Sequence, residues 1–267
     1  MPSQIIYKFR NWSDPVHKRW LLNREIYFAS PKQFNDPFDC AINYRYDLLS
    51  QEEKFEKCYD MQREINRLSS DDEIKRQAYN LLREGNLERD KLLENNKTII
   101  RSMIQERVGI LALTKTKDHI LLWSHYSDYH RGICIGYDKD RLISDLKIKY
   151  NSFEKIFFGM DVNYIEKYPI IIPKKGITPE EYVRNPISTK AKYWEYEQEY
   201  RILLLNGARE LTNVPDETIN EITLGCNMSE QDQINIVEYV IKNLPKMNIY
   251  RAKMHDESFE LVFDKIN

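Results

Sequence analysis

The segment 51–107 constrains the fold of this chain more than any other part. It holds 25 charged residues among its 57, 13 acidic and 12 basic, with one glycine and no proline. In its second half, apolar residues recur at intervals of three to four, the period of one face of an α-helix. They are Leu92, Leu93, Ile99, Ile100, Met103, Ile104 and, just beyond it, Val108. The segment is therefore predicted to form two or three helices with a solvated face.

Apolar segments typical of β-strands lie on both sides of this helical region. Helices are expected after Asp14-Pro15 and after Ser229, which are good starting signals. Because strands and helices alternate without a strict βαβ rhythm, we expect an α+β fold with a mixed central sheet, continuous or split. Residues 1–267 would form one domain, with 51–107 inserted as a helical subdomain. The expected strands are 4–10, 25–29, 108–114, 132–137, 157–165, 196–205, 221–225, 247–253 and 258–263.

The net charge, the apolar runs and the cysteines limit the classes of protein and partner that we expect. The 267 residues include 40 basic and 42 acidic ones, a formal net charge of −2, so the net charge does not indicate a nucleic-acid partner. No apolar run approaches the ~20 residues of a membrane span, and no signal peptide is visible, so we expect a cytoplasmic protein without membrane contact. The four cysteines are scattered, and no metal site is predicted.

Residues 194–201 carry the densest run of candidate catalytic side chains. Folded as a strand, they would place three glutamates and one arginine on one face: Glu195, Glu197, Glu199 and Arg201. Like charges in such a row repel, so it requires cationic partners or a function. A desolvated carboxylate would have a raised pKa and could act as an acid, a base or a stabiliser of a cation. The alternative is a solvated edge strand, paired with lysines or arginines across the sheet.

Residues 122–132 form a second candidate site, because two of the five histidines lie here among aromatic residues. Trp123 and Tyr126 could stack on a planar ring, and His125 could exchange a proton near neutral pH. A core aromatic cluster with a hydrogen-bonded histidine is the alternative. Further candidates for ligand binding are Tyr7 and Arg10 on the first strand, Tyr27 on the second, and Asn35 in the loop 34–39, where a turn-forming role is favoured.

In this order the motifs resemble the uncharacterised bacterial family labelled domain of unknown function 2971. The resemblance extends from residue 5 to the end of the chain. It implies an accessory role such as a toxin or phage-defence effector, and no established reaction. The residues that carry it are Tyr7 to Arg10, Ile26 to Pro31, Phe34 to Asp39, Leu122 to Tyr126, His130, Gly132, Lys192, Trp194, Glu197, Glu199 and Arg201.

The Glu197-x-Glu199 pair before an apolar strand also resembles the acidic motif of ADP-ribosyltransferases. This likeness implies a nucleotide-handling enzyme with NAD as substrate. Glu199 would stabilise the oxocarbenium ion that forms when the nicotinamide–ribose bond breaks. Glu197 would position or deprotonate the acceptor. Arg10 would hold the diphosphate, and His125 would hydrogen-bond a ribose hydroxyl. Nicotinamide would be stacked on Trp123, Tyr126 or Tyr27. Other contacts to the nucleotide would come from Tyr7, Arg201 and Asn35.

Two other functions fit the same residues. In a non-enzymatic binding module, the glutamates would pair with basic residues across the sheet and helices 51–107 would bind a protein partner. In a metal-dependent nuclease, a divalent cation would be held by Asp36, Asp39, Glu197 and Glu199. The near-neutral net charge does not favour a nuclease, although a local basic groove is compatible with this net charge.

Overall fold

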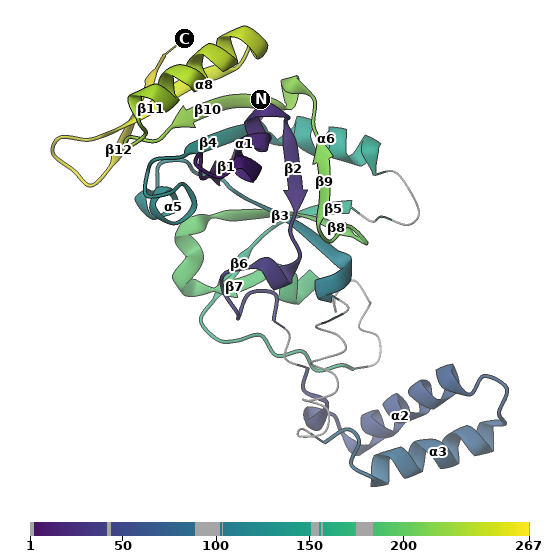
Figure 1. Ribbon diagram of the computed structural model, residues 1–267. Coiled ribbons are helices and arrows are strands. Elements are labelled where there is room, and N and C mark those ends of the chain that lie inside the picture. Colours follow the sequence, from purple (N-terminus) through teal and green to yellow (C-terminus); the bar gives the residue numbers. More distant parts are fainter. Residues whose placement is uncertain are drawn as a thin grey trace. The chain divides into compact units, whose positions relative to one another are not determined.

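The computed structural model describes residues 3–41, 44–88, 102, 104–150, 155, 157–174 and 184–266. The chain divides into two compact units (Figure 1). The first unit comprises residues 1–33, 107–162 and 193–267, and the second comprises residues 34–106 and 163–192. The predicted insertion 51–107 thus falls in the second unit except for Arg107, and its status as a subdomain of a single domain stays a prediction.

An eight-stranded sheet forms the centre of the first unit, in the order β12-β11-β10-β4-β1-β3-β8-β5 (Figure 1). Only β10 and β11 pair in parallel within this sheet; its other neighbouring strands are antiparallel. The predicted α+β class with a mixed sheet is confirmed. The strands are β1 (Ile5–Arg10), β3 (Val108–Thr114), β4 (Ile133–Asp138), β5 (Phe157–Asp161), β8 (Glu199–Leu205), β10 (Ile219–Leu224), β11 (Asn248–Met254) and β12 (Leu261–Lys265). A separate antiparallel pair joins β2 (Glu25–Phe28) to β9 (Glu210–Asn213).

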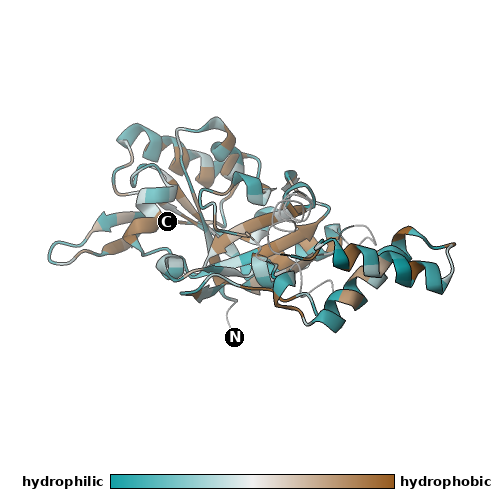
Figure 2. Ribbon diagram, turned by 90° about the horizontal axis from the view of Figure 1, so that it is seen from below, coloured by the Kyte–Doolittle hydropathy of each residue, from teal (hydrophilic) through white to brown (hydrophobic). Residues whose placement is uncertain are grey.

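The large sheet has two chemically different faces, because successive side chains of a strand point to opposite sides. One side, the main-core face, packs against α1 (Pro15–Leu22), α6 (Lys139–Lys149) and α8 (Glu230–Asn243). The other side, the α5 face, packs against α5 (Ile120–Tyr126) through a smaller cluster of Phe9, Leu122, Trp123 and Cys134. Hydropathy follows this arrangement, since apolar residues concentrate along the strands (Figure 2).

Local sequence signals explain where the helices of the first unit begin. Asp14 accepts a hydrogen bond from the Val16 N–H at 2.8 Å, and Pro15 occupies the first turn of α1. Ser229 accepts from the Asp232 N–H at the start of α8 in the same way. Both predicted helix starts are confirmed. None of the described helices is long and apolar enough to cross a membrane.

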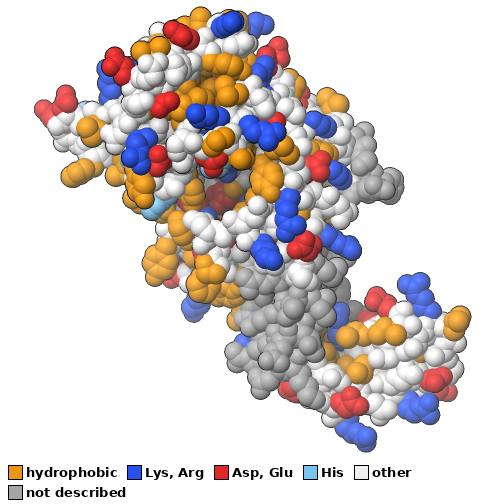
Figure 3. Space-filling model, in the orientation of Figure 1, with side chains coloured by type: hydrophobic (Ala, Val, Ile, Leu, Met, Phe, Trp, Pro, Cys, Tyr) orange, Lys and Arg blue, Asp and Glu red, His pale blue; other side chains and the backbone are white. Residues whose placement is uncertain are grey.

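The second unit contains a pair of helices in the range predicted to be helical, α2 (Gln51–Ile65) and α3 (Asp71–Arg83). Ser50 and Glu53 form a capping box at the start of α2. The two helices bury Cys58 and Ala78 together with the charged Lys54 of α2. Other charged side chains lie on their visible surface (Figure 3). The unit also holds a parallel pair of strands, β6 (Asn163–Ile165) and β7 (Thr189–Ala191). Five of the periodic positions used above lie outside the described residues: Leu92, Leu93, Ile99, Ile100 and Met103.

Three predicted strands begin or end at least three residues away from their predicted bounds. The expected strand 258–263 begins only at Leu261, as β12. The expected strand 196–205 begins only at Glu199, because residues Lys192–Glu197 form a 3-10 helix (η3) and Gln198 turns the backbone with φ at 43°. The expected strand 157–165 is two strands, β5 and β6, which belong to different sheets. Helix α6 was not predicted, although Asp138 caps it and Leu142 and Leu146 supply its buried positions.

Candidate functional site

The predicted acidic motif lies where η3 meets β8, and its geometry differs from the expected row of charges on one strand face. Glu195 is exposed in η3, whereas Glu197 is 4% and Glu199 is 6% exposed. Of the four charged residues, only Glu199 and Arg201 belong to β8, where they lie on the same face. This strand lies between β3 and β5, inside the sheet. The prediction of four charges on one strand face is therefore wrong, and so is the alternative of a solvated edge strand.

Glu199 and Arg201 form a buried bidentate ion pair on the α5 face. Arg201 Nε donates to Glu199 Oε1 at 2.8 Å, and Nη2 donates to Oε2 at 3.1 Å. Arg201 is 0% exposed, and its cross-strand neighbours are Ala112 on β3 and Met160 on β5. Parallel hydrogen bonds of this kind fix both partners in one orientation. The orientation of the Glu199 side chain is thus fixed by Arg201.

Glu197 is held by residues from two other elements. The Tyr126 hydroxyl, at the end of α5, donates to Glu197 Oε1 at 2.7 Å. Thr114 Oγ1, at the end of β3, donates to the Glu197 carbonyl oxygen at 2.5 Å. The two carboxylates therefore lie two residues apart in the chain with different partners, a phenol for one and a guanidinium for the other.

A row of polar side chains crosses the sheet from Glu199. Tyr7 lies opposite Thr114, which lies opposite Glu199, and directly paired residues point to the same face. On the other side of Tyr7, the row continues through Gly136 to Glu221. Burial and the Glu221 carboxylate raise the pKa of the Tyr7 hydroxyl well above its ordinary value. Gly136 makes space for this contact, since a Cβ there would lie 2.6 Å from Glu221 Cγ and 3.1 Å from Tyr7 Cε1.

Lys117 completes this row and is a residue that the sequence reasoning missed. Its ammonium group pairs with Glu221 and lies 4.2 Å from the ring centroid of Tyr250, 5.1 Å from that of Phe263 and 5.7 Å from that of Tyr7. No local signal marks it, because its partners come from β1, β10, β11 and β12. The α5 face thus carries both acidic and basic groups in a largely aromatic setting.

Arg10 lies on the other side of the sheet from the two glutamates. Its guanidinium carbon is 3.7 Å from the ring centroid of Trp20, a residue of the main core. Arg10 and Tyr7 are three residues apart on β1 and so point to opposite faces. Arg10 therefore does not lie beside the two glutamates, where the ADP-ribosyltransferase resemblance implied that it would hold the diphosphate.

The other predicted residues have varied environments. Trp123 is 0% exposed, stands edge-on to Phe9, and donates from Nε1 to the Lys117 carbonyl oxygen at 2.7 Å, as a core residue does. His125 is exposed beside Tyr126. Tyr27 packs partly against the main core, and its hydroxyl donates to Gln33 Oε1 at 3.0 Å. Asn35 belongs to the second unit.

The acidic residues of the nuclease alternative are divided between the two units, with Glu197 and Glu199 in the first. Asp36 and Asp39 belong to the second unit, where Asp39 pairs with Lys190 at 3.7 Å. In the part of the chain that the structure describes, no group of three or more His, Cys, Asp or Glu side chains could hold a metal ion. The nuclease alternative stays a prediction.

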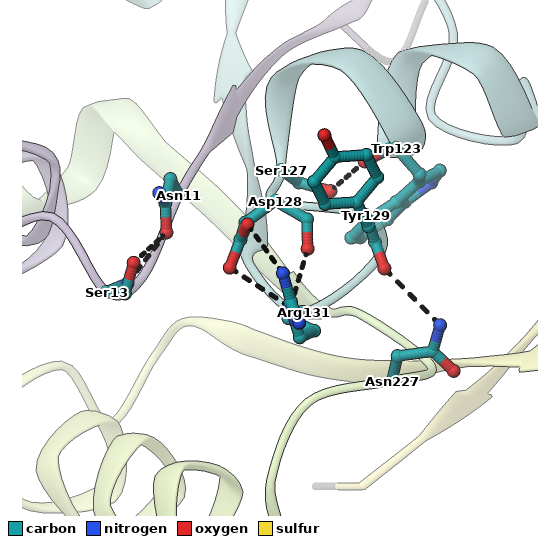
Figure 4. Close-up of polar contacts among 8 residues, drawn as sticks. All are labelled: Asn11, Ser13, Trp123, Ser127, Asp128, Tyr129, Arg131 and Asn227. Atoms are coloured by element: carbon teal, nitrogen blue, oxygen red, sulfur yellow. Dashed lines mark hydrogen bonds and ion pairs between the residues drawn. The ribbon is translucent and has the colours of Figure 1, made fainter.

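A left-handed turn follows α5 and fixes its end (Figure 4). Asp128, Tyr129 and His130 have φ values of 52°, 54° and 67°. This conformation costs roughly 1–2 kcal/mol per residue for L-amino acids. Hydrogen bonds offset the cost, among them those from Ser127 Oγ to the Trp123 carbonyl oxygen at 2.6 Å and from Asn227 Nδ2 to the Tyr129 carbonyl oxygen at 3.3 Å (Figure 4). The turn thereby holds Tyr126, which precedes it, against Glu197.

We expect the free energy of unfolding to fall as the pH is lowered from 7.5 to 5, and His130 to contribute to this loss. Burial lowers the pKa of His130 below its ordinary value. The unfolded chain therefore takes up this proton at a higher pH than the folded chain does. The contribution is complete above the unfolded pKa of about 6.5 and is lost as the pH falls below it. Urea unfolding at several pH values measures the slope.

The variant His130→Gln should reduce this slope, because the titrating group is removed. His255→Gln, which changes an exposed histidine, is the matched control for replacing a histidine with glutamine. A slope in His130→Gln equal to that of the wild type would contradict the assignment.

Comparison with known families agrees with the predicted resemblance. Residues 122–202 match the family model described as protein of unknown function (DUF2971). The matched segment runs from α5 into β8 and contains Tyr126, Glu197, Glu199 and Arg201. The resemblance to this family is confirmed over the matched segment. No curated protein and no solved structure matches the chain, and the resemblance to ADP-ribosyltransferases stays a prediction.

Proposed function

We propose that the protein is a nucleotide-handling enzyme that cleaves the nicotinamide–ribose bond of NAD. One observation carries the proposal: two buried carboxylates, Glu197 and Glu199, lie two residues apart and are held by different partners, Tyr126 and Arg201. Oriented carboxylates in a site of low polarity are suited to stabilising a cation that forms only in the transition state. As part of this proposal, the protein acts in the cytoplasm as a bacterial toxin or phage-defence effector.

The two carboxylates would have different tasks. When the bond from ribose C1′ to the nicotinamide nitrogen breaks, its electron pair leaves with nicotinamide and positive charge develops on the ribose. Glu199, fixed by Arg201, would stabilise this charge. Glu197, oriented by the Tyr126 hydroxyl, would accept the proton of the attacking hydroxyl group as its oxygen bonds to C1′. With water as acceptor, the products are ADP-ribose, nicotinamide and a proton. Arg10 has no part in this mechanism, since it lies on the main-core face.

Nicotinamide release from NAD tests the proposal. We expect Glu199→Gln to lower the rate by about 10²–10³-fold, the effect of removing one group that stabilises transition-state charge. Glu197→Gln should lower it by at least about 10²-fold, as expected for loss of a general base. Glu195→Gln, which changes an exposed residue of η3, is the matched control and should retain the wild-type rate.

Two results would contradict the proposal: a folded wild-type protein that releases no nicotinamide with water or with added acceptors, or a Glu199→Gln variant with the full rate. Circular dichroism of each variant is needed, because Glu199→Gln also removes a partner of buried Arg201. Glu197→Gln leaves that ion pair intact and so separates loss of chemistry from loss of folding.

A non-enzymatic binding module is the second candidate. It is favoured by the complete burial of Arg201, whose guanidinium is bound by Glu199 as in a structural ion pair. In this case the glutamate variants would alter stability without any nicotinamide release by the wild type. The helices α2 and α3 would then be the surface for a protein partner.

A further inference from the structure

Three buried polar atoms without a hydrogen-bond partner lie on α1 and on two strands of the sheet face that α1 covers. They are Arg10 Nε on β1, His17 Nδ1 on α1 and the Tyr137 hydroxyl on β4. Tyr137 is 0% exposed. Native proteins rarely leave a buried polar group unpaired, so three such groups in adjoining elements call for an explanation.

The sheet register brings Arg10 and Tyr137 to the same side. Strands β1 and β4 are antiparallel neighbours in which Arg10 pairs with Ile133 and Tyr137 pairs with Ile6. All four side chains therefore point to the main-core face. Helix α1 covers this part of the face, and the Arg10 guanidinium stacks on its Trp20 at 3.7 Å. Arg10 lies close enough to Tyr137 and His17 for its positive charge to lower the pKa of both groups, against burial in the case of Tyr137.

The surroundings of these atoms are positively charged. Lys8 lies with its Nζ 6.0 Å from the same Trp20 ring and donates to the Ala112 carbonyl oxygen at 2.6 Å. Burial lowers the pKa of Arg10 to about 9, and burial together with the charges of Arg10 and Lys8 lowers the pKa of His17. The carboxylate that faces them is Asp14, which caps α1 and lies 3.8 Å from His17 Nδ1.

Each of the three groups can donate a hydrogen bond and lacks an acceptor for it. A guanidinium N–H and a phenol O–H are donors, and a protonated imidazole donates from Nδ1 as well. We propose that a phosphate-class oxyanion binds between α1 and the main-core face, where it accepts hydrogen bonds from Arg10, Tyr137 and His17. Donors from three separate elements suit a tetrahedral group, and the His17 side chain, 34% exposed, lies on the route from solvent. This site lies across the sheet from Glu197 and Glu199 and is independent of the proposed NAD chemistry.

Calorimetric titration of the wild-type protein with inorganic phosphate tests the site, in a chloride buffer without NAD. Pyrophosphate and ADP extend the series, and acetate represents a carboxylate ligand. We expect phosphate to bind more tightly than acetate. Tyr137→Phe should weaken phosphate binding about tenfold or more, the effect of losing one hydrogen bond to a charged group.

Thr223→Val is the matched control. Thr223 is also 0% exposed with an unpartnered hydroxyl, but it pairs with Cys134 and so lies on the α5 face. Without phosphate, neither variant should lower the melting temperature, since each removes an unpaired hydroxyl. With phosphate, the melting temperature of Thr223→Val should rise as in the wild type, and that of Tyr137→Phe should rise less.

The inference is overturned if the wild type binds no phosphate, if acetate binds as tightly, or if Tyr137→Phe binds phosphate as the wild type does. Glu199→Gln should bind phosphate normally. A failure of the anion site is therefore distinguishable from a failure of the NAD proposal, which is measured by nicotinamide release.

Discussion

Replacing Arg201 with methionine is expected to lower the free energy of unfolding by about 3–5 kcal/mol. The substitution removes the guanidinium that binds both oxygens of Glu199, a carboxylate that is only 6% exposed. A buried charge is far more costly alone than in a hydrogen-bonded pair. All four tryptophans, Trp12, Trp20, Trp123 and Trp194, belong to the first unit, so denaturant unfolding followed by tryptophan fluorescence reports on this unit alone.

The double variant Glu199→Leu/Arg201→Met separates the cost of an unpaired charge from the cost of lost packing. It should recover much of the stability, because apolar residues often replace a buried ion pair with little loss. Lys253→Met breaks the pair with Asp264, in which both side chains are 53% exposed, and should change stability by no more than about 1 kcal/mol. An Arg201→Met variant as stable as Lys253→Met would show that Glu199 finds water or another partner.

Replacing Gly132 with alanine is expected to lower the free energy of unfolding by about 4–5 kcal/mol, at the upper end of single substitutions. A Cβ at this position would lie 2.1 Å from the Arg10 carbonyl oxygen and 2.9 Å from that of Ser127. Both are backbone atoms, which cannot rotate away. The Gly132 N–H also donates to the Ser127 carbonyl oxygen at 2.7 Å, so any shift disturbs the left-handed turn. The same fluorescence measurement gives the loss.

Gly136→Ala, on β4 itself, is the control for adding one methyl group to the same part of the sheet. Its Cβ would meet side-chain atoms, Glu221 Cγ at 2.6 Å and Ile5 Cγ2 at 2.9 Å, which can move at a cost of about 1–3 kcal/mol. A smaller loss for Gly132→Ala than for Gly136→Ala would mean that the turn after α5 adjusts easily. The turn would then not fix the position of Tyr126.

Much of the fold was predictable because its signals are local. The cap at Asp14 and Pro15 and the cap at Ser229 act within one turn of helix, and both helices begin as predicted. Continuous apolar residues identified β3 and β4 because central strands are buried on both faces. The start of β8 was not predictable. The expected row of charges assumed that side chains alternate between the two faces of one continuous strand, and the left-handed backbone at Gln198 interrupts this alternation.

The candidate site was predicted in its residue types and only partly in its arrangement. Glu197, Glu199 and Arg201 are all buried, but they do not form one row on a strand. Arg10 was assigned to them from its place on the first strand, and strand alternation puts it on the opposite face. Lys117 was missed because no spacing in the chain marks it.

The sequence by itself determined the elements of this protein: the α+β class, the helix starts and most strands, because periodicity and caps depend on residues within a few positions of one another. Only the tertiary structure decided which side chains meet. Tyr126 and Glu197 are 71 residues apart, and Lys117 and Glu221 are 104 apart. Their contacts follow from the order of strands in the sheet and from which face each residue occupies. Both properties depend on how the distant segments bury their apolar surfaces together.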